Sequence, residues 1–230
     1  MSIKEILQEN KNNFARVIDL DYHSLPYSVF DLTDKNQDLQ KVDLSDVEDF
    51  HKYLKDVMKR DKSFFGIGRY NENRTIYNHS DLFDGEEEAR TLHLGIDLWV
   101  DKSGVNVFAP LGGMVHSFNN NEGVGDYGPT IILEHSIKGE IFYTLFGHLD
   151  ISSLLNMQEG QQVKKGEKIG SIGCYPENGN WPPHLHFEII LDMQDKKGDF
   201  PGVAKVSERE YWLKICPDPN LILNIEGLNN

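Results

Sequence analysis

The hydrophobic pattern of the chain changes near residue 91. Before that point, apolar residues recur at helical spacing, whereas after it short runs rich in Val, Ile, Phe and Tyr are separated by glycines. The change predicts a mainly β protein with an α-helical N-terminal segment. We expect three parts: a helical or mixed segment over 1–90, a β domain over 91–195, and an extension over 196–230 that packs on it.

Two helices are predicted within the first part. The stronger signal covers residues 46–60, and its apolar residues share one helical face: Val47, Phe50, Leu54, Val57 and Met58. Ser45 and Glu48 have the spacing of a capping box at its start. A shorter and weaker pattern predicts a helix over residues 3–14, and the polar stretch 33–43 between the two helices reads as a loop.

Six apolar runs predict the strands of the β domain. They cover 105–109, 113–118, 130–134, 141–146, 168–172 and 184–191. Their short length and close spacing are typical of a compact antiparallel sheet or of a barrel-like arrangement, with glycines at the turns between the runs. No repeat of fixed period interrupts this pattern.

Composition and charge limit the classes of protein to which this chain can belong. Hydrophobic residues make up 39% of the 230 positions, which is typical of a soluble globular protein, and the longest apolar run, 141–146, is far too short to span a bilayer. Lys4 and Glu5 interrupt the stretch where a secretory signal would lie, so we expect a cytoplasmic protein. The net charge of −14 disfavours nucleic-acid and membrane partners. The acidic run 81–88 reads as a solvated connector.

Histidines supply the candidate chemistry. His184 and His186 lie two positions apart in a predicted strand, so both imidazoles face the same side. His93 and Asp97 lie four apart around a glycine, and His148 follows another apolar run. Two neutral imidazoles and one carboxylate, with a fourth position left to water, are the ligand set of a catalytic zinc site. The two cysteines lack the spacing of a cysteine zinc site or a disulfide framework.

Three motifs carry a resemblance to a known family. In chain order they are HLGID at 93–97, FGHL at 146–149 and HLH at 184–186. Together with the stretches between them, over about residues 91–192, they resemble the lysostaphin/LytM-type zinc metallopeptidases of peptidase family M23. The resemblance implies a compact antiparallel β fold with the site in a groove.

The resemblance also implies roles for five residues. Zinc would be held by His93, Asp97 and His186, with His148 and His184 as the catalytic pair. The chain has no HExxH glutamate, so the general base is either His184 or His148, and the other would stabilise the oxyanion or protonate the leaving amine. We therefore expect a zinc-dependent hydrolase acting on a peptide or amide substrate.

Two other functions compete with this hypothesis. One is a non-catalytic zinc-containing domain that serves as a binding or scaffold module of a metabolic assembly. The stretches DYGPTIILEH, NWPPHLHF and CPDPN also resemble a cytoplasmic subgroup of the family, in which similar domains are fused to kinase-like and aminotransferase domains. The other is a cupin-like iron oxygenase, which is disfavoured because no histidine follows His186 and HxxxD replaces the usual HxD. The sequence predicts no particular oligomeric state.

Overall fold

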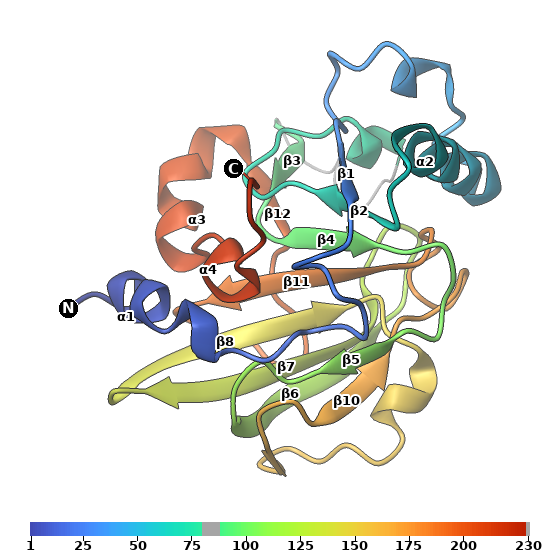
Figure 1. Cartoon of the computed structure of the whole chain (residues 1–230). Coiled ribbons are helices and arrows are strands. Elements are labelled where there is room, and N and C mark those ends of the chain that lie inside the picture. Colours follow the sequence, from blue (N-terminus) through green and yellow to red (C-terminus); the bar gives the residue numbers. More distant parts are fainter. Residues whose placement is uncertain (80–87, 229–230) are drawn as a thin grey trace.

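The computed structural model describes residues 1–79 and 88–228, and its centre is one twisted sheet of eight strands (Figure 1). In spatial order the strands are β1 (Tyr27–Phe30), β2 (Phe65–Gly68), β4 (Ile96–Trp99), β11 (His184–Ile190), β8 (Glu140–Gly147), β7 (Gly128–Ile137), β6 (Gly113–Asn121) and β9 (Gln162–Val163). Neighbours are antiparallel except β1 and β2. The prediction of a mainly β, antiparallel fold is confirmed, and the sheet runs open from β1 to β9.

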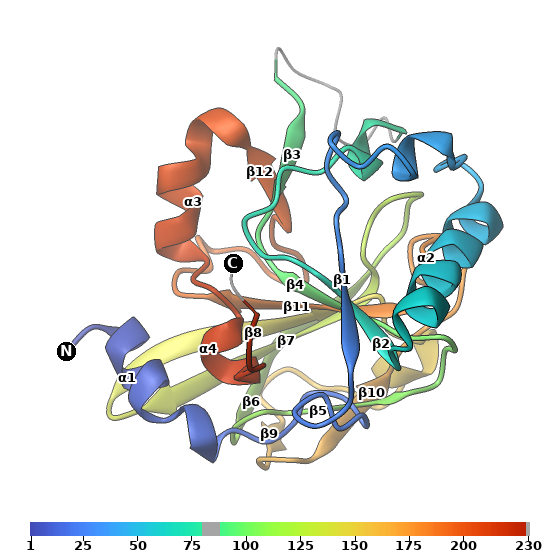
Figure 2. The ribbon, with the colours of Figure 1, turned by 45° about the horizontal axis from the view of Figure 1, so that its top comes forward.

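Two small ribbons and several helices surround this sheet. The ribbons are β5 (Asn106–Phe108) with β10 (Lys168–Ser171), and β3 (Arg90–His93) with β12 (Val203–Lys205). The α-helices are α1 (Ile3–Glu9), α2 (Val47–Asp61), α3 (Arg209–Ile215) and α4 (Asn220–Leu223). Short 3₁₀ turns cover Lys11–Asn13, Leu39–Lys41, Ile76–His79, Ile151–Leu154 and Val206–Glu208. Figure 2 shows α2 beside β1 and β2, with α1 and α4 together on the opposite side of the molecule. Within the described ranges, no helix has the length and apolar character to cross a membrane.

Helix α2 forms where it is predicted, but its cap differs. Asp46, and not Ser45, is the N-cap, because the Asp46 carboxylate accepts hydrogen bonds from the backbone N–H groups of Glu48 and Asp49. The Ser45 hydroxyl is held by Asp43 at 2.6 Å instead. The predicted capping box is therefore wrong, although an acidic N-cap suits the helix dipole equally well.

The first helix is shorter than the sequence predicts. It ends at Glu9 because the Asn10 side chain donates to the Ile6 carbonyl oxygen, at 2.8 Å, and a 3₁₀ turn follows. The acidic run 81–88, predicted as a connector, lies outside the described residues except for Glu88.

The N-terminal part also supplies strands β1 and β2, which the hydrophobic pattern does not predict. Strand β2 has the sequence FGIG, whose two glycines weaken any strand signal. It pairs with β4 and sets Gly68 opposite Asp97. Residues before 91 therefore extend the sheet on the side of the candidate site. The boundaries 1–90, 91–195 and 196–230 stay a prediction.

Alternation along β11 separates the core from the site. Leu185 and Phe187 face the main apolar core, which also holds apolar side chains of β4, β7 and β8. His184, His186 and Glu188 occupy the alternate positions and face the other side of the sheet. All seven residues of β11 are buried, so ionisable groups on this face are removed from water.

A buried histidine outside the site predicts how stability depends on pH. His135 contacts the Thr144 hydroxyl and the Gly112 carbonyl, and burial lowers its pKa from 6.5 to about 4. The unfolded chain binds a proton there below pH 6.5 and the folded chain does not, so this stabilisation is lost as the pH falls from 6.5 towards 4. Between pH 7 and pH 5 the loss amounts to about 2 kcal/mol.

We expect His135→Gln, which cannot titrate, to reduce the pH dependence of unfolding by about that amount. Urea unfolding of both proteins, with equal metal content, at pH 7 and pH 5 measures it. Equal pH dependence in the two proteins would contradict the expectation.

Candidate metal centre

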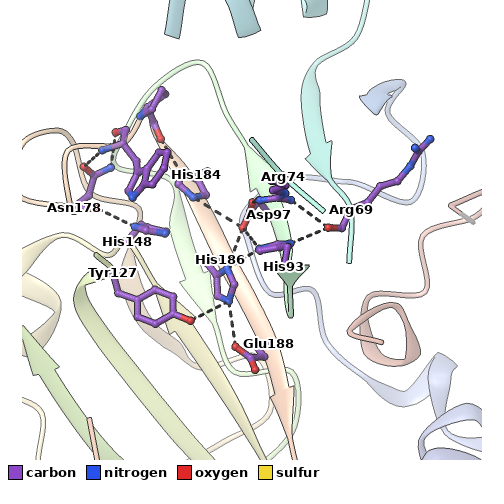
Figure 3. Close-up of polar contacts among 12 residues, drawn as sticks. Arg69, Arg74, His93, Asp97, Tyr127, His148, Asn178, His184, His186 and Glu188 are labelled. Atoms are coloured by element: carbon purple, nitrogen blue, oxygen red, sulfur yellow. Dashed lines mark hydrogen bonds and ion pairs between the residues drawn. The ribbon is translucent and has the colours of Figure 1, made fainter. Parts of the chain in front are cut away.

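Three side chains from three strands meet on the face of the sheet that carries His184, His186 and Glu188 (Figure 3). They are His93 at the end of β3, Asp97 in β4 and His186 in β11, and the pairing of β4 with β11 sets Asp97 directly opposite His186. Asp97 Oδ1 lies 3.2 Å from His93 Nε2 and 3.1 Å from His186 Nδ1. The two imidazole nitrogens are 3.1 Å apart. All three side chains are buried, and they form a group able to hold a metal ion.

The geometry of this cluster fits a divalent metal. In a tetrahedral zinc site with bonds of about 2.0–2.2 Å, ligand atoms lie roughly 3.3–3.6 Å apart, within a few tenths of the distances here. Gly95 makes this approach possible, since a Cβ at that position would lie 2.5 Å from His186 Cε1. Two imidazoles and one carboxylate leave a coordination position open, which is the arrangement of catalytic sites.

Each imidazole of the cluster is oriented by a hydrogen-bond partner at the ring nitrogen that faces away from the cluster. His93 Nδ1 donates to the backbone carbonyl of Arg69 at 2.8 Å, which leaves Nε2 unprotonated towards the cluster. His186 Nε2 lies 3.3 Å from Glu188 Oε2 and 3.4 Å from the Tyr127 hydroxyl, so its Nδ1 faces Asp97. Such outer contacts fix the tautomer of a metal-ligating histidine.

The other two predicted histidines lie beside the cluster. His148 Nδ1 and His184 Nδ1 contact the backbone carbonyls of Asn178 and Pro182, each at 2.8 Å. The ring centroids of His148 and His184 are 4.1 Å apart, and His184 Nε2 lies 4.0 Å from Asp97 Oδ1. His148 has a φ of 61°, a left-handed conformation that costs a non-glycine residue about 1–3 kcal/mol and is found at functional sites.

Burial and the neighbouring carboxylates set the pKa values of the four imidazoles in the site. Burial lowers the pKa of His93 and of His184 to about 4, and it lowers the pKa of His148 well below the usual value. These three rings are therefore neutral at pH 7. Burial would lower the pKa of His186 too, but Asp97 and Glu188 raise it above its usual value. A position whose neighbouring carboxylates favour positive charge is suited to a bound cation.

A pocket of about 310 Å³ gives access to these groups. Asp97, His148, His184 and His186 line it, and its aromatic lining comprises Tyr77, Trp99, Tyr127, Trp181 and Phe200. The charged groups Arg90, Asp126, Lys196 and Asp199 also border it. The volume is at the lower end of the range for small-molecule sites. The structure therefore brings all five predicted site residues together, while their individual roles stay predictions.

Sequence reasoning missed four residues that support this site: Arg74, Tyr77, Asn178 and Glu188. Only Glu188 had a usable local signal, because its position two residues after His186 puts it on the same face of the strand. Arg74 and Asn178 act on residues that lie 23 and 30 positions away. Tyr127 also lines the pocket and contacts His186.

Comparison with known proteins confirms the resemblance. Residues 91–198 match the model of peptidase family M23. A crystal structure of a SpoIIIAH and SpoIIQ complex is 26% identical, covering 50% of this chain and 68% of that one, with a TM-score of 0.34. The catalytic domain of lysostaphin from Staphylococcus simulans is 23% identical, covering 53% and 80%, with a TM-score of 0.34. A mutant catalytic domain of the prophage-encoded M23 protein EnpA from Enterococcus faecalis is 21% identical, covering 48% and 79%, with a TM-score of 0.36. No curated protein sequence matches the chain.

Proposed function

We propose that this protein is a zinc-dependent hydrolase that cleaves a peptide or amide bond in the pocket beside His186. The observation that carries the proposal is the cluster of His93, Asp97 and His186, whose ligand atoms are 3.1–3.2 Å apart, next to two further imidazoles in one pocket. The match of residues 91–198 to a peptidase family supports a metallopeptidase. It also disfavours the cupin-like oxygenase.

The two remaining histidines would move the protons. A bound zinc ion would polarise the substrate carbonyl and make water a nucleophile at neutral pH. His184 and His148 each have Nδ1 bonded to a backbone carbonyl, which leaves Nε2 to exchange a proton at the pocket. We assign His184 as general base and His148 as the group that stabilises the oxyanion or protonates the leaving amine, and the two roles could be exchanged.

Glu188 does not take the place of these histidines as base. Its carboxylate contacts His186 on the side away from Asp97, the residue is fully buried, and it does not line the pocket. Its contact orients a ligand and leaves proton transfer at the pocket to the imidazoles. The absence of an HExxH glutamate from the sequence is consistent with this division.

Metal-dependent cleavage of short peptides tests the proposal. Protein loaded with one equivalent of zinc is incubated with a library of internally quenched peptides. We expect turnover that a zinc chelator abolishes and that added zinc restores, with elemental analysis to distinguish zinc from iron. Stoichiometric zinc with no cleavage of any peptide or amide would favour the binding or scaffold module instead.

We further propose that the natural substrate is a soluble peptide or amide and not intact cell wall. The net charge of −14 repels anionic wall polymers at long range. Tyr77 and residues 200–203 also line the pocket. All of them lie outside the segment that matches the family model, residues 91–198. These lining residues favour a small substrate. Cytoplasmic location stays a prediction.

Suspensions of purified peptidoglycan should therefore clear slowly or not at all with this protein. Turbidity is followed at physiological salt with zinc-loaded protein, and a known wall hydrolase serves as the positive control for each preparation. The same protein stock is assayed on short peptides, so that inactive protein is recognised. Rapid clearing would contradict the proposed substrate class.

A further inference from the structure

Arg74 precedes the segment matched by the peptidase family, yet its guanidinium reaches the centre of the candidate site. We propose that Arg74 is a positioning residue of the metal centre, which holds Asp97 so that a single carboxylate oxygen faces His93 and His186. The inference rests on the metal site of the proposed function. It adds a residue of the N-terminal part to that site.

The two oxygens of Asp97 have different partners. Oδ2 accepts a hydrogen bond from Arg74 Nη1 at 2.6 Å, a short charge-assisted contact. Oδ1 is the oxygen that lies 3.2 Å from His93 Nε2 and 3.1 Å from His186 Nδ1. Because Arg74 binds Oδ2, Oδ1 is the oxygen that the carboxylate presents to the two imidazoles. Arg74 therefore sets the direction of this ligand and favours monodentate binding of a metal.

Arg74 can do this because its own position is fixed. Its side chain is 1% exposed, and its other N–H groups contact Glu72 Oε2 at 3.0 Å and the Tyr77 hydroxyl at 3.1 Å. A further N–H group contacts the Arg69 carbonyl at 3.2 Å (Figure 3). A planar guanidinium with this many directed contacts has one orientation available. Gly68 provides the space, since a Cβ there would lie 2.5 Å from Arg74 Nη2.

The same short segment orients a second ligand. The backbone carbonyl of Arg69 accepts from Arg74 Nη2 and also from His93 Nδ1. Two of the three proposed ligands, His93 and Asp97, thus take their orientation from residues 69–74. The structure gives this part of the chain a role in building the site as well as in extending the sheet.

Charge and geometry predict opposite effects of removing Arg74. A guanidinium near the site repels a metal cation, so loss of charge alone would tighten metal binding, whereas loss of orientation would weaken it. Arg74→Lys separates the two effects. Lysine keeps the charge, but its single nitrogen cannot reproduce the directed contacts that three separate guanidinium nitrogens make with Asp97, Glu72 and the Arg69 carbonyl.

Metal affinity measured without any peptide tests the proposal. Zinc affinity is determined by competition with a chromophoric chelator, and the visible spectrum of the cobalt-substituted protein reports the ligand geometry. We expect Arg74→Lys to bind zinc about 10- to 100-fold more weakly than wild type and to alter the cobalt spectrum. The control is Arg60→Lys, since Arg60 is an exposed arginine paired with Asp61.

A second variant keeps the inference testable if Arg74→Lys does not fold. Arg74→Met combined with Glu72→Gln removes both buried charges, so that neither is left unpaired, and it takes the same test. Unchanged or tighter zinc binding with an unchanged cobalt spectrum would overturn the inference. A wild-type protein that binds zinc and cleaves nothing would refute the proposed function and leave this inference standing. A wild-type protein that binds no metal would overturn both.

Discussion

We expect the wild-type protein to contain one zinc ion per chain, and purified His93→Ala and His186→Ala proteins to contain essentially none. Either change leaves Asp97 and one imidazole, and two protein ligands are too few to hold the ion through purification. The oxygen and nitrogen atoms of this cluster lie 3.1–3.2 Å apart, so every ligand contributes to the same point. Elemental analysis after gel filtration in zinc-free buffer measures the loss.

An exposed histidine provides the matched control for this experiment. His23→Ala removes an exposed imidazole that does not belong to the cluster, and this variant should keep its zinc. Circular dichroism of each variant shows whether the sheet is intact, because both ligands are buried and their loss leaves a cavity. Full zinc content in His93→Ala or in His186→Ala would mean that the ligand set must be redrawn.

The strands after residue 91 could be predicted because most of them carry a clear local signal. Runs such as 130–134 and 141–146 are rich in β-branched and aromatic residues between turn glycines, and they form β7 and β8. Strand β4 is four residues long and buried on both faces, so it lacks the alternation that marks a half-buried strand. Strand β2 contains two glycines that make room for Phe30 and Arg74, contacts that no local pattern reveals.

The site was predictable to the extent that its residues are close in sequence. Alternation in HLH puts His184 and His186 on one face of a strand, and the structure has them there. The approach of His148 and of Asp97 to that face depends on β11 lying between β4 and β8, which follows from long-range pairing. The family resemblance supplied this arrangement in advance. The contact of Arg74 with Asp97 lies outside the resemblance and had to come from the structure.

His148→Ala and His184→Ala proteins are expected to keep their zinc and to lose about 10²- to 10⁴-fold in turnover, the usual contribution of a general acid or base. Neither imidazole belongs to the cluster that could hold the metal, and each faces the pocket through Nε2, because Nδ1 is bonded to a backbone carbonyl. Turnover is measured on whichever peptide the wild type cleaves, together with zinc content.

Two further variants serve as controls for this experiment. His184 stacks on Trp99 with ring centroids 3.8 Å apart, so His184→Phe, which retains an aromatic ring without a nitrogen, distinguishes lost packing from lost proton transfer. His116→Ala, which changes a half-buried histidine of β6 outside the pocket, should turn over at the wild-type rate. A wild-type rate in His148→Ala or His184→Ala would remove that residue from the catalytic pair. Loss of zinc from His184→Ala would instead make it a ligand, because its Nε2 is already only 4.0 Å from Asp97 Oδ1.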